Sequence, residues 1–107
     1  MARTLTRLHD LVIASGETAS AAIDVPDGAH SLMLFGPAAL TGTVTVQVQR
    51  PSEDAYCALQ SGGSDVTQTA ASKATSLYPI NFKRLRLVSG SAEAAARTFE
   101  VWARYPA

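Results

Sequence analysis

The chain has 107 residues, with nine basic and nine acidic side chains and a formal net charge of zero. Its length predicts one domain over residues 1–107, and its 47% of hydrophobic residues argues against disorder. The balanced charge disfavours nucleic acid as a partner, because domains that bind polyphosphates carry a basic surplus.

The N-terminal stretch lacks the signals of export and of membrane insertion. Its apolar run LVIA (11–14) is shorter than the hydrophobic region of a signal peptide. No segment approaches the roughly 18 apolar residues that a membrane helix requires. We therefore expect a protein that is used without export and that has no membrane partner.

A side-chain period of two runs through most of the chain and predicts β-strands. Residues 1–6 alternate without a preceding partner segment, so we expect an extended N-terminal arm there. The run SLMLF (31–35) is continuously apolar, which is typical of a strand that is covered on both faces. We expect about eight strands, over residues 3–13, 18–25, 30–35, 42–49, 55–60, 66–77, 82–89 and 97–105.

The last strand, RTFEVWARY (97–105), has the clearest division into two faces. The residues predicted to point into the core are Phe99, Val101, Ala103 and Tyr105. The residues predicted to point outward are Thr98, Glu100, Trp102 and Arg104. In FKRLRLVSG (82–90), Leu85 and Leu87 share one face, while Arg84 and Arg86 share the other.

Turn residues separate these segments roughly every ten residues, a spacing typical of antiparallel sandwiches and barrels. QSGGSD (60–65) is expected to form a β-turn or hairpin loop. SAEAAAR (91–97) favours a helix by composition, but seven residues are too few for a stable one, so we expect a loop or a single turn. The predicted fold is an all-β antiparallel sandwich.

No set of residues has the spacing of a catalytic or metal site. The only histidines, His9 and His30, have no partner at ligand spacing, and we expect structural or exposed roles for both. The single cysteine, Cys57, excludes a disulfide within the chain and lies among apolar neighbours, as a buried thiol does. We therefore expect no enzyme activity, no cofactor, no metal and no small-molecule substrate.

Two features indicate a protein–protein surface. Lys83, Arg84 and Arg86 are close together, although a simple solvated strand face also explains them. Trp102 shares its predicted face with Glu100 and Arg104, and Trp and Arg are enriched at the energetic centres of interfaces.

The C-terminal stretch TSLYPINFKRLRLVSGSAEAAARTFEVWARY (75–105) resembles the capsid decoration, or cement, proteins of tailed bacteriophages. Those proteins are jelly-roll sandwiches. LYPINFKRLRLVSG followed by RTFEVWARY is similar to their last two strands, which we expect to be paired.

The resemblance implies a structural role on the outside of a virion assembled in the host cytoplasm. Such a protein forms a homo-oligomer, here a dimer or trimer, binds the major capsid protein and stabilises the shell by bridging capsomers. This role requires adhesive surfaces. We expect them on one face formed by Arg84, Arg86, Glu100, Trp102 and Arg104, and on the N-terminal arm around Arg3 and Arg7.

Two other functions fit a small sandwich. The first is a carbohydrate- or receptor-binding module of a phage tail or of a secreted enzyme. The second is a cupin-like enzyme, which would need a cluster of His and Glu ligands that this sequence does not offer.

Overall fold

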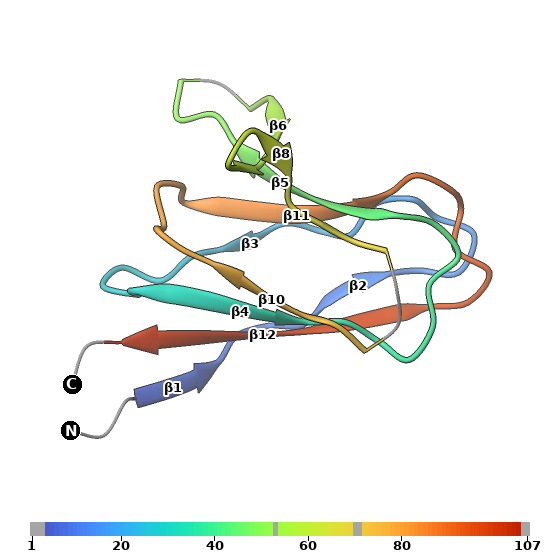
Figure 1. Ribbon diagram of the computed structural model, residues 1–107, viewed down its shortest axis with the longest axis horizontal. Coiled ribbons are helices and arrows are strands. Elements are labelled where there is room, and N and C mark those ends of the chain that lie inside the picture. The colour runs from blue at the N-terminus through green and yellow to red at the C-terminus, as the bar shows by residue number, and fades with distance from the viewer. Residues whose placement is uncertain (1–3, 53, 70–71, 106–107) are drawn as a thin grey trace.

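Two antiparallel sheets lie face to face in the computed structural model, which describes residues 4–52, 54–69 and 72–105 (Figure 1). The first sheet contains β1 (Thr4–Arg7), β2 (Leu11–Ile13), β4 (Ser31–Phe35), β10 (Ala74–Leu77) and β12 (Arg97–Tyr105). The second contains β3 (Ile23–Asp24), β5 (Val44–Gln49), β6 (Tyr56–Ala58), β9 (Thr67–Gln68) and β11 (Arg84–Ser89). A small hairpin, β7 (Gln60–Ser61) with β8 (Ser64–Asp65), stands apart from both.

The strand order is that of a jelly roll. The first sheet runs β1-β12-β4-β10, with β2 also on β12, and the second runs β3-β11-β5-β6, with β9 also on β5. From β2 to β5 and again from β9 to β12 the chain alternates between the two layers, while β5, β6 and β9 stay in the second, as in double-sheet jelly rolls. The predicted all-β antiparallel sandwich of jelly-roll type is confirmed.

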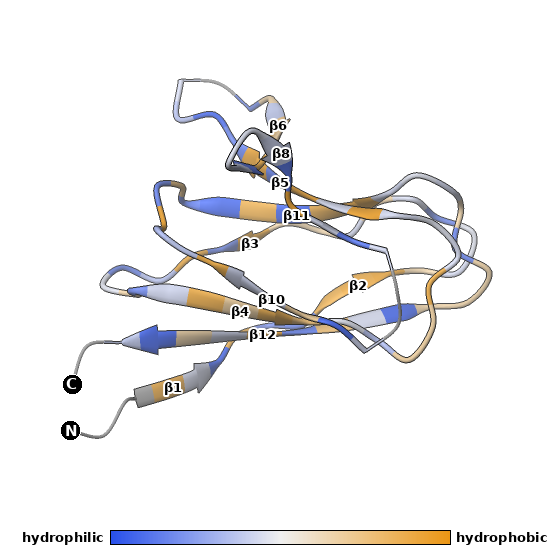
Figure 2. Ribbon diagram, viewed as in Figure 1, coloured by the Kyte–Doolittle hydropathy of each residue, from blue (hydrophilic) through white to orange (hydrophobic). Residues whose placement is uncertain are grey.

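Alternation along the strands builds the core between the sheets. Twelve apolar side chains are buried there, namely Leu11, Ile13, Leu32, Leu34, Val44, Val46, Leu77, Leu85, Leu87, Phe99, Val101 and Ala103. The alternating hydrophilic and hydrophobic colours along the first half of β11 in Figure 2 follow this period of two. The faces predicted for the last strand and for Leu85 and Leu87 are therefore correct.

The N-terminal segment is a strand of the first sheet from Thr4 onward, so the expectation of a free arm over residues 1–6 is wrong for that part. Thr4–Arg7 pairs antiparallel with β12, with Thr4 opposite Tyr105. Residues 8–10 interrupt the ladder before β2 pairs with the other half of β12. Residues 1–3 lie outside the described part of the chain.

Three other expectations about strands are wrong in detail. Residues 66–77 do not form one strand, because β9 lies in the second sheet and β10 in the first. The last two strands are not paired, since β11 pairs with β3 and β5 while β12 pairs with β1, β2 and β4. In the segment 18–25 only Ile23–Asp24 forms a ladder, and Ala19 makes a single bridge to Val88.

The observed turns agree with those expected from the sequence more closely than the strands do. Gly62 and Gly63 both have positive φ angles, of 62° and 85°, as a tight two-residue hairpin turn between β7 and β8 requires. The segment 91–96 is a loop without a helical turn.

We predict that Val46→Ala lowers the free energy of unfolding by roughly 2 kcal/mol, because it removes two methyl groups from a fully buried site. The matched control Val12→Ala removes the same atoms from a side chain that is 42% exposed and should cost less than about 0.5 kcal/mol. Chemical denaturation of the three proteins measures both. Equal losses would contradict the assignment of the core.

Candidate functional site

The outer face of the first sheet carries a group of apolar side chains around Trp102. Strand register places Met33 beside Trp102 on β4 and Arg7 beside it on β1. We call this surface the Trp102 face and define it as Leu5, Arg7, Met33, Phe35, Glu100, Trp102 and Arg104. Five of these residues, Leu5, Met33, Phe35, Glu100 and Trp102, line a shallow hollow of about 550 Å³.

The Trp102 face is apolar and open to solvent. Leu5 is 61% exposed and Phe35 is 41% exposed, while Met33 and Trp102 are half-buried. On the same strand as Met33 and Phe35, Leu32 and Leu34 are fully buried. The run SLMLF is therefore covered on one face only, and the expectation that both faces are covered is wrong for the isolated chain.

Charged groups surround the apolar centre of the Trp102 face. The indole Nε1 of Trp102 donates a hydrogen bond to Glu100 Oε1 at 3.1 Å, and Arg7 Nη1 lies 3.8 Å from the same oxygen. Arg7 also contacts Asp10 at 3.1 Å. Arg104 differs, because its side chain has no hydrogen-bond or ion-pair partner among the described residues and its Nε is buried without one.

The two other predicted interface residues, Arg84 and Arg86, lie on the opposite side of the molecule. Both are on β11, on the outer face of the second sheet. Arg86 Nε donates to Gln47 Oε1 at 2.9 Å, and its guanidinium lies 4.3 Å from the centre of the Tyr56 ring. Arg84 Nε lies 2.8 Å from Asp24.

The expectation of one continuous face that contains Trp102, Arg84 and Arg86 is therefore wrong. Strand parity correctly indicates that each side chain points outward, but it does not say from which sheet. Of the residues predicted for the arm, Arg7 joins the Trp102 face, and Arg3 lies outside the described residues.

A second hollow has a volume of about 780 Å³. It is formed by the connections β3–β4, β5–β6 and β10–β11. Its charged lining residues are Asp24, Asp27, Arg50, Asp54, Lys83 and Arg84, and Asn81 and Phe82 contribute an amide and an aromatic ring.

Neither histidine nor the cysteine takes part in a catalytic arrangement among the described residues. His9 is exposed, with Nδ1 2.9 Å from the Asp10 carbonyl oxygen, and the His30 ring packs against Tyr78 at 4.9 Å. Cys57 is half-buried on β6, opposite Val48, and so is less buried than expected. In the described part of the chain no three His, Cys, Asp or Glu side chains gather as a metal site would require.

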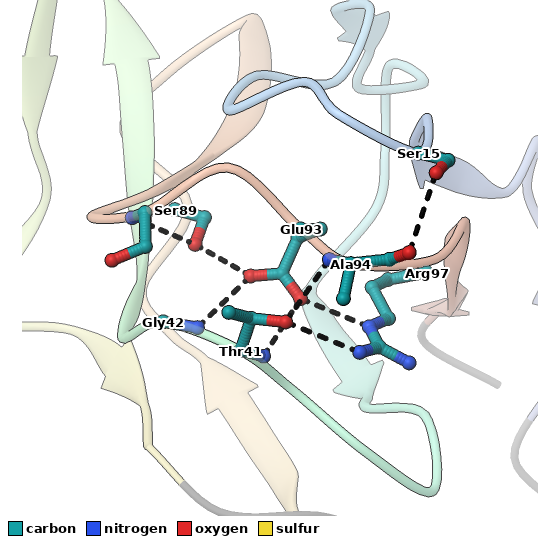
Figure 3. Close-up of polar contacts among 8 residues, drawn as sticks. Ser15, Thr41, Gly42, Ser89, Glu93, Ala94 and Arg97 are labelled. Atoms are coloured by element: carbon teal, nitrogen blue, oxygen red, sulfur yellow. Dashed lines mark hydrogen bonds and ion pairs between the residues drawn. The ribbon is translucent and has the colours of Figure 1, made fainter.

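Among the described residues one carboxylate is buried, and its role is not evident from the local sequence. Glu93 is 1% exposed and lies in the loop between β11 and β12 (Figure 3). Its two oxygens accept four hydrogen bonds, from the amides of Thr41 and Gly42, from Ser89 Oγ and from Arg97 Nε, at 2.7 to 3.0 Å. Its own backbone bonds to Gly16 and Glu17, so the Glu93 clamp joins three connections at one end of the sandwich.

The clamp is a structural site and not a catalytic one. Burial alone would raise the pKa of Glu93, but the hydrogen bonds that its carboxylate accepts outweigh that effect and lower the pKa from 4.5 to about 2. A buried group with a shifted pKa is a candidate for chemistry when it faces a cleft. Glu93 lines neither hollow, and both oxygens are already bonded within the protein.

Close backbone approach is part of the clamp. A Cβ atom on Gly42 would lie 2.6 Å from Ser89 Oγ and 2.8 Å from the Ser91 amide nitrogen. Only glycine therefore allows the β4–β5 connection to reach the carboxylate. Nothing local in SAEAAAR indicates this role, because Thr41 and Gly42 lie about 50 residues earlier in the chain.

Comparison of the chain with protein-family models, with curated proteins and with solved structures finds no match. The resemblance of residues 75–105 to decoration proteins thus stays a prediction. In the part of the chain that the structure describes, no helix has the length and apolarity needed to cross a membrane.

We predict that the Glu93 clamp contributes to acid sensitivity. Because the pKa is lowered on folding, the stabilisation is fully present above about pH 4.5 and is lost as the pH falls toward 2. Glu93→Gln should destabilise the protein by roughly 3 kcal/mol at pH 7. All four partners of Glu93 are hydrogen-bond donors, and the NH2 group of Gln is also a donor, so it cannot bond to the partners that it faces.

Unfolding measured from pH 7 to pH 2 tests this. The gap between wild type and Glu93→Gln should shrink as the pH falls, whereas the control Glu17→Gln, which changes an exposed side chain, should follow wild type throughout. A gap that is independent of pH would contradict the role of the ionised carboxylate.

Proposed function

We propose that this protein is a non-enzymatic structural protein that binds other proteins through the Trp102 face. The observation that carries the proposal is an apolar surface with Trp102 at its centre and charged groups at its edge. Apolar and aromatic centres with polar rims are the usual composition of protein–protein contact surfaces. Trp102 is also held in one orientation by its bond to Glu100, which lowers the entropic cost of docking.

The assembly that we propose this protein joins is the protein shell of a tailed bacteriophage. This part of the proposal rests on the resemblance of residues 75–105 to decoration proteins. A protein that binds only the assembled shell stabilises it by mass action, and many copies acting together add avidity. The small rigid sandwich supports this role, because a rigid body transmits load between the proteins it contacts.

Carbohydrate binding is a second candidate, favoured by the 780 Å³ hollow beside Phe82. Carboxylates, an amide and cations there could bond to sugar hydroxyls, while the ring could support the apolar face of a sugar.

We predict that Trp102→Ala leaves the fold intact and weakens binding to shells by more than tenfold. The side chain lies on the outer face of the sheet and its loss leaves the core unchanged. Co-sedimentation with shells that lack the protein measures the binding, and circular dichroism checks the fold. Tyr56→Ala, which removes an aromatic ring from the opposite sheet, is the control.

Binding of Trp102→Ala at the wild-type affinity would overturn the role of this face. Failure of the wild-type protein to co-sediment with shells would overturn the capsid proposal itself. Screening a glycan array with wild type and Asn81→Ala then tests the second candidate. Sugar binding that the substitution abolishes would support it, and a blank array would exclude it.

A further inference from the structure

We propose that the occupant of the Trp102 face is a second copy of this chain, related by a two-fold axis. The axis lies in the plane of the contact, crosses β12 at right angles and passes over Trp102. This inference rests on the proposed function and refines it, because the Trp102 face then holds two copies together and the shell binds the dimer. Three observations carry it.

The first observation is the composition of β4. Its sequence is that of a strand covered on both faces, yet the isolated chain covers only the face with Leu32 and Leu34. Met33 and Phe35 remain on the open side. A second sheet laid on that side would complete the environment that the sequence of β4 predicts.

The second observation is the charge order along β12. A carboxylate at Glu100 and a cation at Arg104 stand at equal spacing on either side of Trp102. The proposed axis runs the two β12 strands in opposite directions, so that Glu100 of each copy faces Arg104 of the other. The Arg104 guanidinium, which has no side-chain partner among the described residues, thereby gains an anion.

The third observation is the order of side-chain sizes along β4. Register aligns Phe35 with Glu100, Met33 with Trp102 and Ser31 with Arg104. The same axis therefore sets the large Phe35 of each copy over the small Ser31 of the other, with the two Met33 residues at the centre. One symmetry operation satisfies both the charges of β12 and the sizes of β4.

The net charges of this surface fit a contact with itself and not with an acidic or a basic partner. The Trp102 face carries both signs, since Glu100 is its carboxylate and Arg7 and Arg104 are its cations. Arg7 already makes ion pairs with Asp10 and Glu100, which leaves Arg104 as the cation on this face that lacks a side-chain partner among the described residues.

The test is a charge exchange, followed by sedimentation equilibrium of the purified protein without shells. Wild type should form a dimer. Glu100→Arg and Arg104→Glu should each weaken self-association at least tenfold, because each places two pairs of like charges in contact. An equimolar mixture should recover the affinity of wild type to within about threefold, since both pairs are again opposite in the mixed dimer.

A wild-type monomer, or two variants that stay apart when mixed, would overturn the inference. Failure of either variant to fold does not end the test, because cross-linking gives a second measurement. In a Cys57→Ser background, Met33→Cys lies next to the axis and should join to its copy through a bismaleimide that spans about 10 Å, the spacing of packed sheets.

Thr45→Cys, on the outer face of the second sheet, is the matched control and should not cross-link. Cross-linking at Thr45→Cys alone would overturn the inference in favour of the opposite sheet. Co-sedimentation with shells separates the two proposals. If the protein is a monomer that binds shells, the dimer is excluded and the proposed function stands. If it is a dimer that does not bind shells, the capsid proposal is excluded and the dimer stands.

Discussion

The buried carboxylate of Glu93 fixes the end of the sandwich from which β12 begins. It draws the connections β2–β3, β4–β5 and β11–β12 to one point, and its bond to Arg97 holds the first residue of β12. Because side chains alternate along a strand, the position of its start and its ladders with β2 and β4 determine which residues face inward. Phe99 points inward and Trp102 points outward because both belong to the same alternation of side chains along β12.

Alternation in the sequence was enough to predict the inner and outer faces of the long strands. Leu85, Leu87, Phe99 and Val101 are buried as expected, because a period of two is a local property of the chain. Partnership between strands is not local. The sequence of β11 resembles that of a neighbour of β12, yet the jelly roll places the two in different layers, and this separates Arg84 and Arg86 from Trp102.

The same limit explains what was missed at the candidate site. Met33 and Phe35 were assigned to a strand covered on both faces, since nothing in SLMLF says which neighbours are present. Glu93 was part of a segment that favours a helix, and its partners lie on other connections. Residues whose roles depend on long-range contacts carry little signal of their own, whereas turn residues such as Gly62 and Gly63 do.

The two outer faces of the sandwich have different physical characters. On the second sheet the cations of β11 are engaged by Asp24, Gln47 and Tyr56, so that face is largely satisfied within the chain. On the first sheet, Leu5 and Phe35 are exposed, and the Arg104 guanidinium has no partner in the part of the chain that the structure describes. The exposed apolar side chains Leu5 and Phe35 therefore both lie on the outer face of the first sheet.

The pairing of β1 with β12 has a consequence for how the molecule responds to force. Thr4 lies opposite Tyr105, and the two strands run antiparallel, so their outer ends leave the sheet side by side (Figure 1). Tension applied at these ends would act along the hydrogen bonds and open the ladder one bond at a time, as a zipper opens. Tension applied across the sheet faces would instead load many contacts at once. The direction of the load therefore decides whether the contacts break one after another or together.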